Sequence, residues 1–102
     1  MDLSEFGRFS DPALLILASL AGGEKHGYAM MEDIQQMTGV RLGAGTLYGA
    51  LSRLENAGLI EALPADERRR PYRLTEPGAA CLRLTLTSLQ KFVSQGLKRL
   101  TV

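Results

Sequence analysis

The order of the patterns along the chain is the strongest constraint on its fold. Apolar residues recur at helical spacing up to Gly58, and the short run Leu59–Leu63, followed by Pro64, is typical of a strand. Pro71–Thr75 predicts its antiparallel partner, and the charged segment 65–70 predicts a projecting loop rather than a two-residue turn. The chain therefore has to place one small hairpin between helices.

Three short helices are expected before the hairpin. Asp11 and Pro12 form a good helix start, because an Asp side chain accepts a free backbone N–H and Pro at the first position loses no hydrogen bond. The spacing predicts helices over 12–21, 28–38 and 44–57, each followed by glycine. The first helix is apolar on nearly every side, which indicates a place at the centre of the core.

A long helix over 76–100 is expected after the hairpin, with Thr75 as its cap. Its apolar residues recur in steps of four and three, which is a heptad-like seam. A helix about 35 Å long cannot bury its whole apolar face on so small a body, so we expect a homodimer. The residues expected at the dimer contact are Leu82, Leu86, Leu89, Phe92, Val93, Leu97 and Leu100.

This order of elements predicts a mainly α fold with a small two-stranded β wing, that is, a winged helix-turn-helix followed by a dimerisation helix. We expect residues 1–75 to form the DNA-binding domain and residues 76–102 to form the dimerisation helix. The apolar content of 45% and charged content of 23% are ordinary for one globular domain.

Charge, cysteine content and hydropathy restrict the partners and the cellular compartment of the protein. Twelve Lys and Arg against eleven Asp and Glu give a net charge of +1, so only the distribution of charge can indicate a partner. Cys81 is the single cysteine and is expected to be a packing residue in a reducing compartment. The uncharged stretch 12–23 is too short to span a bilayer, so a cytoplasmic protein without a membrane partner is expected.

No pattern in the sequence indicates an enzyme. His26 is the only histidine and has no second ligand or catalytic partner, so we expect it to fix the start of the second helix by hydrogen bonding. No glycine-rich phosphate loop or nucleophile motif occurs. The sequence therefore predicts neither a catalytic site, nor a metal site, nor a cofactor.

The third helix is predicted to present a small, polar outer face. With Leu47, Leu51 and Leu54 inward, the outward residues and those nearest the helix start are Ala44, Gly45, Thr46, Tyr48, Gly49 and Ser52, with Arg53 at the edge. Each glycine costs a helix about 1 kcal/mol, which is understandable if the backbone approaches a DNA groove. Tyr48 is either a half-buried aromatic over the helix junction or a phosphate contact through its hydroxyl.

The hairpin tip carries a cluster of arginines. A charge run is usually a solvated face, but in a winged domain the tip lies beside the recognition helix, where arginines neutralise phosphates or enter the minor groove. Asp66 and Glu67 partly offset this charge, and Lys25, His26 and Arg41 add to the basic rim. The residues expected to bind DNA here are Arg68, Arg69, Arg70 and Arg73.

Several short motifs together resemble the PadR family of bacterial transcriptional regulators. They are His26-Gly27-Tyr28, Gly45-Thr46-Leu47-Tyr48, Leu51, Arg53-Leu54-Glu55, Gly58-Leu59-Ile60, and Arg70-Pro71-Tyr72-Arg73-Leu74-Thr75 with Gly78. The resemblance implies a winged helix-turn-helix repressor that binds double-stranded operator DNA, an inverted repeat, as a homodimer. The single C-terminal helix is similar to the family's shorter subgroup, whereas Gly49 stands where the family commonly has proline.

Two alternatives stay open at this level. Some members of the family release DNA on binding a small aromatic effector, and Phe6, Phe9, Phe92 and the methionines are either the lining of such a site or dimer core. The near-neutral net charge also suits a winged-helix module that docks another protein and does not bind DNA.

Overall fold

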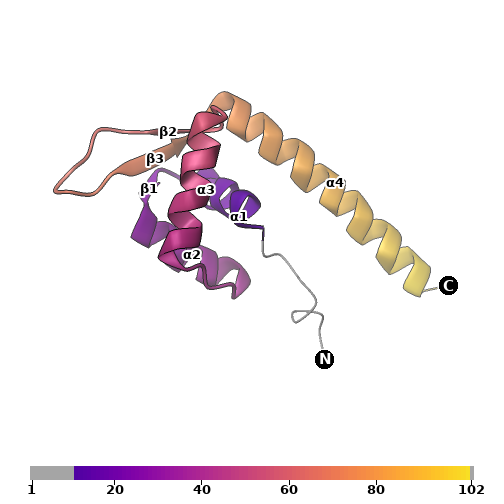
Figure 1. The fold of residues 1–102 in the computed structure, drawn as a ribbon. Coiled ribbons are helices and arrows are strands. Elements are labelled where there is room, and N and C mark those ends of the chain that lie inside the picture. Colours follow the sequence, from indigo (N-terminus) through magenta and orange to yellow (C-terminus); the bar gives the residue numbers. More distant parts are fainter. Residues whose placement is uncertain (1–10, 102) are drawn as a thin grey trace.

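The computed structural model describes residues 11–101 as three short helices, a small sheet and one long helix (Figure 1). The hairpin projects from one side of the three-helix body, and the long helix runs away from it on another (Figure 1). In chain order the elements are α1 (Pro12–Ala21), β1 (Lys25–His26), α2 (Gly27–Thr38), α3 (Ala44–Asn56), β2 (Ile60–Ala62), β3 (Pro71–Leu74) and α4 (Glu76–Leu100).

The helix starts confirm the capping residues predicted from the sequence. The Asp11 carboxylate accepts the N–H of Ala13 at 3.0 Å, and Thr75 Oγ1 accepts the N–H of Gly78 at 3.1 Å. His26 Nδ1 accepts the N–H of Ala29 at 3.5 Å, so this histidine does fix the start of α2. The predicted boundaries are one residue off at two ends, because α2 begins at Gly27 and α3 ends at Asn56.

The core forms around α1, as its continuous apolar character predicted. Leu15, Ile16, Leu17 and Leu20 are buried, and they pack with apolar residues of the other helices and of β2: Met30, Ile34, Leu47, Ala50, Leu51, Leu54, Ile60 and Leu82. Burial of this single contiguous cluster is the main favourable term for folding.

A buried polar group ties the end of α1 to its neighbours. Ser19 is buried and donates its hydroxyl to Asp33 Oδ2 of α2 at 2.6 Å. Lys25 Nζ of β1 donates to the carbonyl oxygens of Ser19 at 2.6 Å and of Gly23 at 3.1 Å. These bonds satisfy the free carbonyls that a helix end leaves and hold α1, β1 and α2 together.

The sheet has three antiparallel strands in the order β1-β3-β2, so the predicted two-stranded wing lacked one strand. β3 pairs with β2 through Ile60 opposite Leu74 and Ala62 opposite Tyr72, and β1 pairs with its other edge through Lys25 opposite Tyr72. β1 contains two residues, which is too short for an alternating pattern to appear in the sequence.

The tip of the hairpin corrects a second expectation. Asp66 and Arg69 exchange backbone hydrogen bonds of 2.7 and 2.8 Å, so the projecting loop closes on a two-residue turn at Glu67 and Arg68. Both turn residues have positive φ, 47° and 71°, the conformation for which hairpins usually select Asn and Gly. The prediction failed because Glu67 and Arg68 are not residues from which such a turn is recognised in a sequence.

The start of α4 is fixed by a close backbone contact. Gly78 is buried, and a Cβ atom at this position would overlap the carbonyl oxygen of Leu59. Thr75 donates its N–H to that same oxygen at 3.2 Å and its hydroxyl to the carbonyl of Gly58 at 2.7 Å. Only glycine permits this approach, which joins α4 to the segment that follows α3.

Candidate nucleic-acid interface

The outer face of α3 carries the residues that the sequence placed there. Leu47, Ala50, Leu51 and Leu54 are buried, and the opposite face is open to solvent. The predicted residues that are exposed are Ala44, Gly45, Thr46, Tyr48, Gly49, Ser52 and Arg53. The face is small, polar and free to meet a partner.

Tyr48 agrees with the first alternative considered for it, and its contact with a phosphate stays a prediction. Its ring packs against Gly27 at the start of α2, where an added Cβ would lie 2.5 Å from the Tyr48 hydroxyl oxygen. The residue nevertheless stays 51% exposed. It therefore covers the helix junction and also presents its phenol at the surface, and Gly27 is the residue that makes room for it.

The start of α2, the exposed face of α3 and the hairpin tip enclose one cleft of about 280 Å³. Its lining residues are His26, Gly27, Tyr28, Tyr48, Arg68, Arg69, Arg70 and Tyr72. The structure thus brings Tyr48 beside three of the four wing arginines proposed from sequence. Tyr28 and Tyr72 belong to the motifs that resemble the PadR family but were not predicted as DNA-binding residues. The position of Tyr28 directly after the His-Gly pair was the signal available for it.

Tyr72 keeps its proton in this setting. Burial raises the pKa of its phenol above the ordinary value, and nearby Glu55 and Tyr48 raise it further, whereas Arg70 acts in the opposite direction. The Tyr72 hydroxyl is therefore neutral near pH 7 and can donate a hydrogen bond.

Arg73 lies apart from the other arginines. It forms an ion pair with Glu61, the residue directly opposite in β2, and both side chains are about half exposed. Side chains alternate along a strand, so Arg73 lies on the opposite face of the sheet from Tyr72 and Leu74, which pack against the core. The structure does not bring Arg73 into the cleft.

The long helix divides into a buried start and an exposed remainder. Leu82, expected at a dimer contact, is only 5% exposed and belongs to the core of its own chain, so that expectation is wrong for this residue. Leu86 and Val93 are about half exposed, Leu97 is 60% exposed and Leu100 is 83% exposed. Phe92 and Leu84 are both 74% exposed, and Leu84 was not singled out from the sequence.

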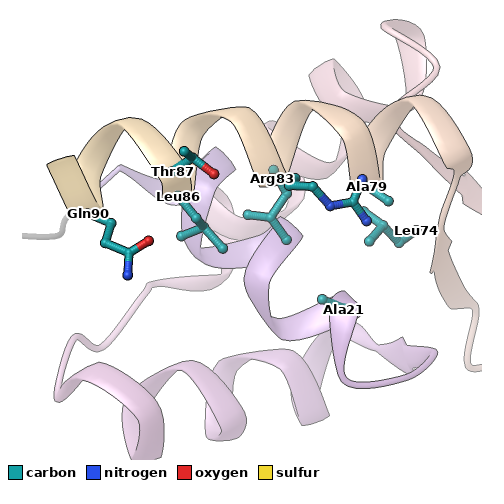
Figure 2. Close-up of a pocket in the computed structure, with 8 residues that line it drawn as sticks. Ala21, Leu74, Ala79, Arg83, Leu86, Thr87 and Gln90 are labelled. Carbon is teal, nitrogen blue, oxygen red and sulfur yellow. The ribbon is translucent and has the colours of Figure 1, made fainter.

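An apolar groove of about 580 Å³ runs along the first half of α4, beside the end of α1 (Figure 2). Ala21 lies across from the α4 side chains, and Arg83, Thr87 and Gln90 supply polar groups (Figure 2). Of the residues considered for an effector site, Met30 is buried in the core, and Phe6 and Phe9 lie outside the described residues.

Within residues 11–101, no helix is both long and apolar enough to cross a membrane. In the same part of the chain, no three His, Cys, Asp or Glu side chains gather as metal ligands would.

A sequence model of the transcriptional regulator PadR-like family matches residues 16–84. The chain belongs to this family. Members of the PadR-like family are transcriptional regulators that bind DNA, not enzymes, and the winged helix-turn-helix fold agrees with this membership.

Named relatives agree with the PadR-like assignment. Transcriptional regulator Rv3488 of Mycobacterium tuberculosis is 42% identical over 72 residues, which cover 68% of this chain and 66% of the relative. Transcriptional activator GvpE2 of Halobacterium salinarum is 32% identical over 72 residues, which cover 71% of this chain and 36% of that protein. A protein from a Streptomyces fradiae transposon is 47% identical over 75 residues, which cover 74% of this chain and 22% of that protein.

Solved structures share the PadR-like fold. A PadR family transcription regulator from Clostridium difficile superposes with a TM-score of 0.73 at 26% identity, covering 84% of this chain and 97% of that one. A transcriptional regulator from Clostridium thermocellum gives a TM-score of 0.72 at 28% identity, covering 81% and 89%. The match therefore extends over nearly the whole length of both neighbours.

Proposed function

We propose that this PadR-like regulator is a homodimeric repressor that inserts α3 into the major groove of an operator and lays its hairpin wing along the adjacent backbone. The observation that carries the proposal is the cleft in which Tyr48, on the exposed face of α3, lies beside the wing arginines Arg68, Arg69 and Arg70. A recognition helix beside a basic wing is the arrangement that winged domains use on duplex DNA.

The side chains of α3 divide by what each can contact. Thr46 and Ser52 have hydroxyls that bond either to base edges or to phosphates, and Ala44 offers an apolar contact to a thymine methyl. Gly45 and Gly49 let the backbone come close to the groove floor. Tyr48 and Arg53 contact phosphates and so fix the register of the helix on the duplex.

The wing supplies charge. Arg68, Arg69 and Arg70 face the cleft and the DNA backbone, and their contacts release counterions, which makes binding dependent on salt. Arg73 is assigned a smaller part, because Glu61 already neutralises it and it lies outside the cleft.

The dimer forms through α4. Beyond Leu82, α4 presents to solvent Leu86, Phe92, Val93, Leu97 and Leu100. A heptad-like seam of this kind favours a second copy of the same helix as the partner. Two copies related by a two-fold axis place their recognition helices about 34 Å apart, one turn of DNA, so the operator is an inverted repeat.

For a small aromatic effector, the site that we propose is the groove beside α4. Transcription from the regulated promoter, with and without the protein, tests the direction of control. Repression is expected, and an increase would make this chain an activator, the role in the name of the Halobacterium relative.

The deciding experiment is a fluorescence-anisotropy titration with duplex DNA from upstream of the protein's own gene, at several salt concentrations. Saturable, salt-dependent binding is expected. Arg70→Ala should weaken binding to all sequences alike and lower the slope of log affinity against log salt by about one. Thr46→Ala should instead relax sequence preference at one position.

Lys98→Ala, which removes a cation from α4, is the matched control and should leave the slope unchanged. Absence of saturable binding by the unaltered protein at low salt would overturn the proposal and favour a protein-docking module.

A further inference from the structure

Two side-chain nitrogen atoms from different elements lie close together in the cleft. His26 Nε2, at the start of α2, lies 3.4 Å from Nη1 of Arg69 in the wing. The other ring nitrogen, Nδ1, is the acceptor for the N–H of Ala29 at 3.5 Å. The imidazole thus faces α2 with one nitrogen and the wing with the other.

The tautomer of the ring decides what Nε2 can do, because a neutral imidazole has one acceptor nitrogen and one N–H donor. In one tautomer Nε2 is an acceptor for Arg69. The bond that Nδ1 accepts from Ala29 favours the other tautomer, with the hydrogen on Nε2. The Nε2–H and the guanidinium N–H are then both donors, so they cannot bond to each other, and both are satisfied by one acceptor placed between them.

We propose that His26 and Arg69 together form a seat for one phosphate of the DNA backbone, whose oxygen accepts a hydrogen bond from each. This inference rests on the proposed function and adds to it a third DNA-contacting element, the start of α2. The seat opens into the cleft shared by Tyr48 and Tyr28, whose exposed phenols can donate to the same phosphate group.

The chemistry of the seat favours a phosphodiester. Arg69 carries a full positive charge, and a guanidinium bonds phosphate oxygens with good geometry. Arg68 and Arg70 line the same small cleft and increase its attraction for an anion. The seat joins the start of α2 to the wing, in the cleft that Tyr48 of α3 also lines. It therefore lies beside α3 and the wing, the two elements that reach the duplex in the proposed complex.

The first measurement is the tautomer of His26 by long-range ¹H–¹⁵N NMR of the free protein. The Nε2–H form is expected, with a further change in the Nε2 signal when upstream duplex DNA is added. The Nδ1–H form would make Nε2 the acceptor for Arg69, so the contact would be an internal bond between wing and α2 and the proposal would be wrong.

The second measurement is a double-mutant cycle with the same duplex across a range of salt. His26→Asn keeps an acceptor for the cap of α2 but withdraws the donor from the cleft. Arg69→Ala should lower affinity about tenfold and the salt slope by about one. His26→Asn should also weaken binding, and the double variant should bind about as weakly as Arg69→Ala alone, because both groups hold one phosphate.

Single neutral methylphosphonates along the duplex locate the phosphate. A methylphosphonate at one position per half-site should weaken binding of the unaltered protein. The same methylphosphonate should not weaken binding of Arg69→Ala. This comparison does not need the His26→Asn variant. Lys98→Ala, the control cation on α4, should retain the effect.

The outcomes separate the two proposals. If the unaltered protein binds no DNA, the proposed function fails and this inference with it. If it binds and the two substitutions are additive, or no phosphate position depends on Arg69, the inference alone fails.

Discussion

Gly45 and Gly49 on the outer face of α3 have no packing reason to be glycine. A Cβ on Gly45 would meet no described atom within 4 Å, and one on Gly49 would meet only the end of the Arg53 side chain at 3.7 Å. Gly49 lies inside the helix, where alanine is more favourable by about 1 kcal/mol, and Gly45 lies in its first turn, where the preference for alanine is smaller. The cost is explained if the backbone of α3 has to approach DNA closely.

Gly45→Ala and Gly49→Ala should therefore stabilise the protein and weaken its binding to DNA. Chemical denaturation should show a rise of about 0.5 to 1 kcal/mol in the free energy of unfolding for each substitution. Anisotropy should show lower affinity. Ser88→Ala in α4, at an exposed position away from the apolar seam, is the control: it should stabilise slightly without changing DNA affinity. Tight DNA binding by Gly45→Ala would contradict this account.

The turn at the wing tip is strained, because Glu67 and Arg68 both have positive φ. Glu67→Asn should raise the free energy of unfolding by about 1 kcal/mol, since asparagine tolerates the left-handed region better than glutamate. It also removes an acidic group beside the arginines and should tighten DNA binding. Glu24→Asn is the control, because it removes the same charge outside the turn. Thermal unfolding of this variant should show no rise in stability.

At the scale of elements, the sequence predicted what local chemistry determines. The caps Asp11 and Thr75 and the apolar spacing located the helices, and the position of the charged tip located the hairpin. β1 escaped prediction because a two-residue strand exists only through its pairing with β3. The ion pair of Arg73 likewise depends on cross-strand register, which the arginine run does not contain.

The pattern of α4 could not separate contacts within the chain from contacts between chains. Leu82 and Leu97 fall in the same apolar seam, yet α1 covers only the first of them. The three-helix body covers only the first part of α4, and the position at which this cover stops is set by the folded structure. The heptad spacing is the same before and after that position, so the sequence does not reveal it.

Leu82→Ala and Leu97→Ala should accordingly differ in their effect on a single chain. Leu82→Ala should lower the free energy of unfolding by about 2 to 5 kcal/mol, because it leaves a cavity in the core. Leu97→Ala should change it by less than about 0.5 kcal/mol. Denaturation at concentrations where light scattering gives the monomer mass makes the comparison, and equal losses would contradict the division of α4.

For the whole molecule, the proposed dimer depends on one face of α4. Leu97→Glu places a charge in the proposed seam and should halve the mass found by light scattering, with helical content kept in circular dichroism. DNA affinity should fall as well, because one chain contacts only one half-site. Leu84→Glu is the matched control, since Leu84 is as exposed but lies on the opposite side of the helix. A dimer that survives Leu97→Glu would exclude the seam.

The contact between Gly78 and the Leu59 carbonyl has a consequence for DNA sequence choice. It fixes the angle at which α4 leaves the body, and in a two-fold dimer that angle sets the separation of the two copies of α3. In the proposed complex, the number of base pairs between operator half-sites would therefore be determined far from any base, by the absence of one methyl group at a helix start.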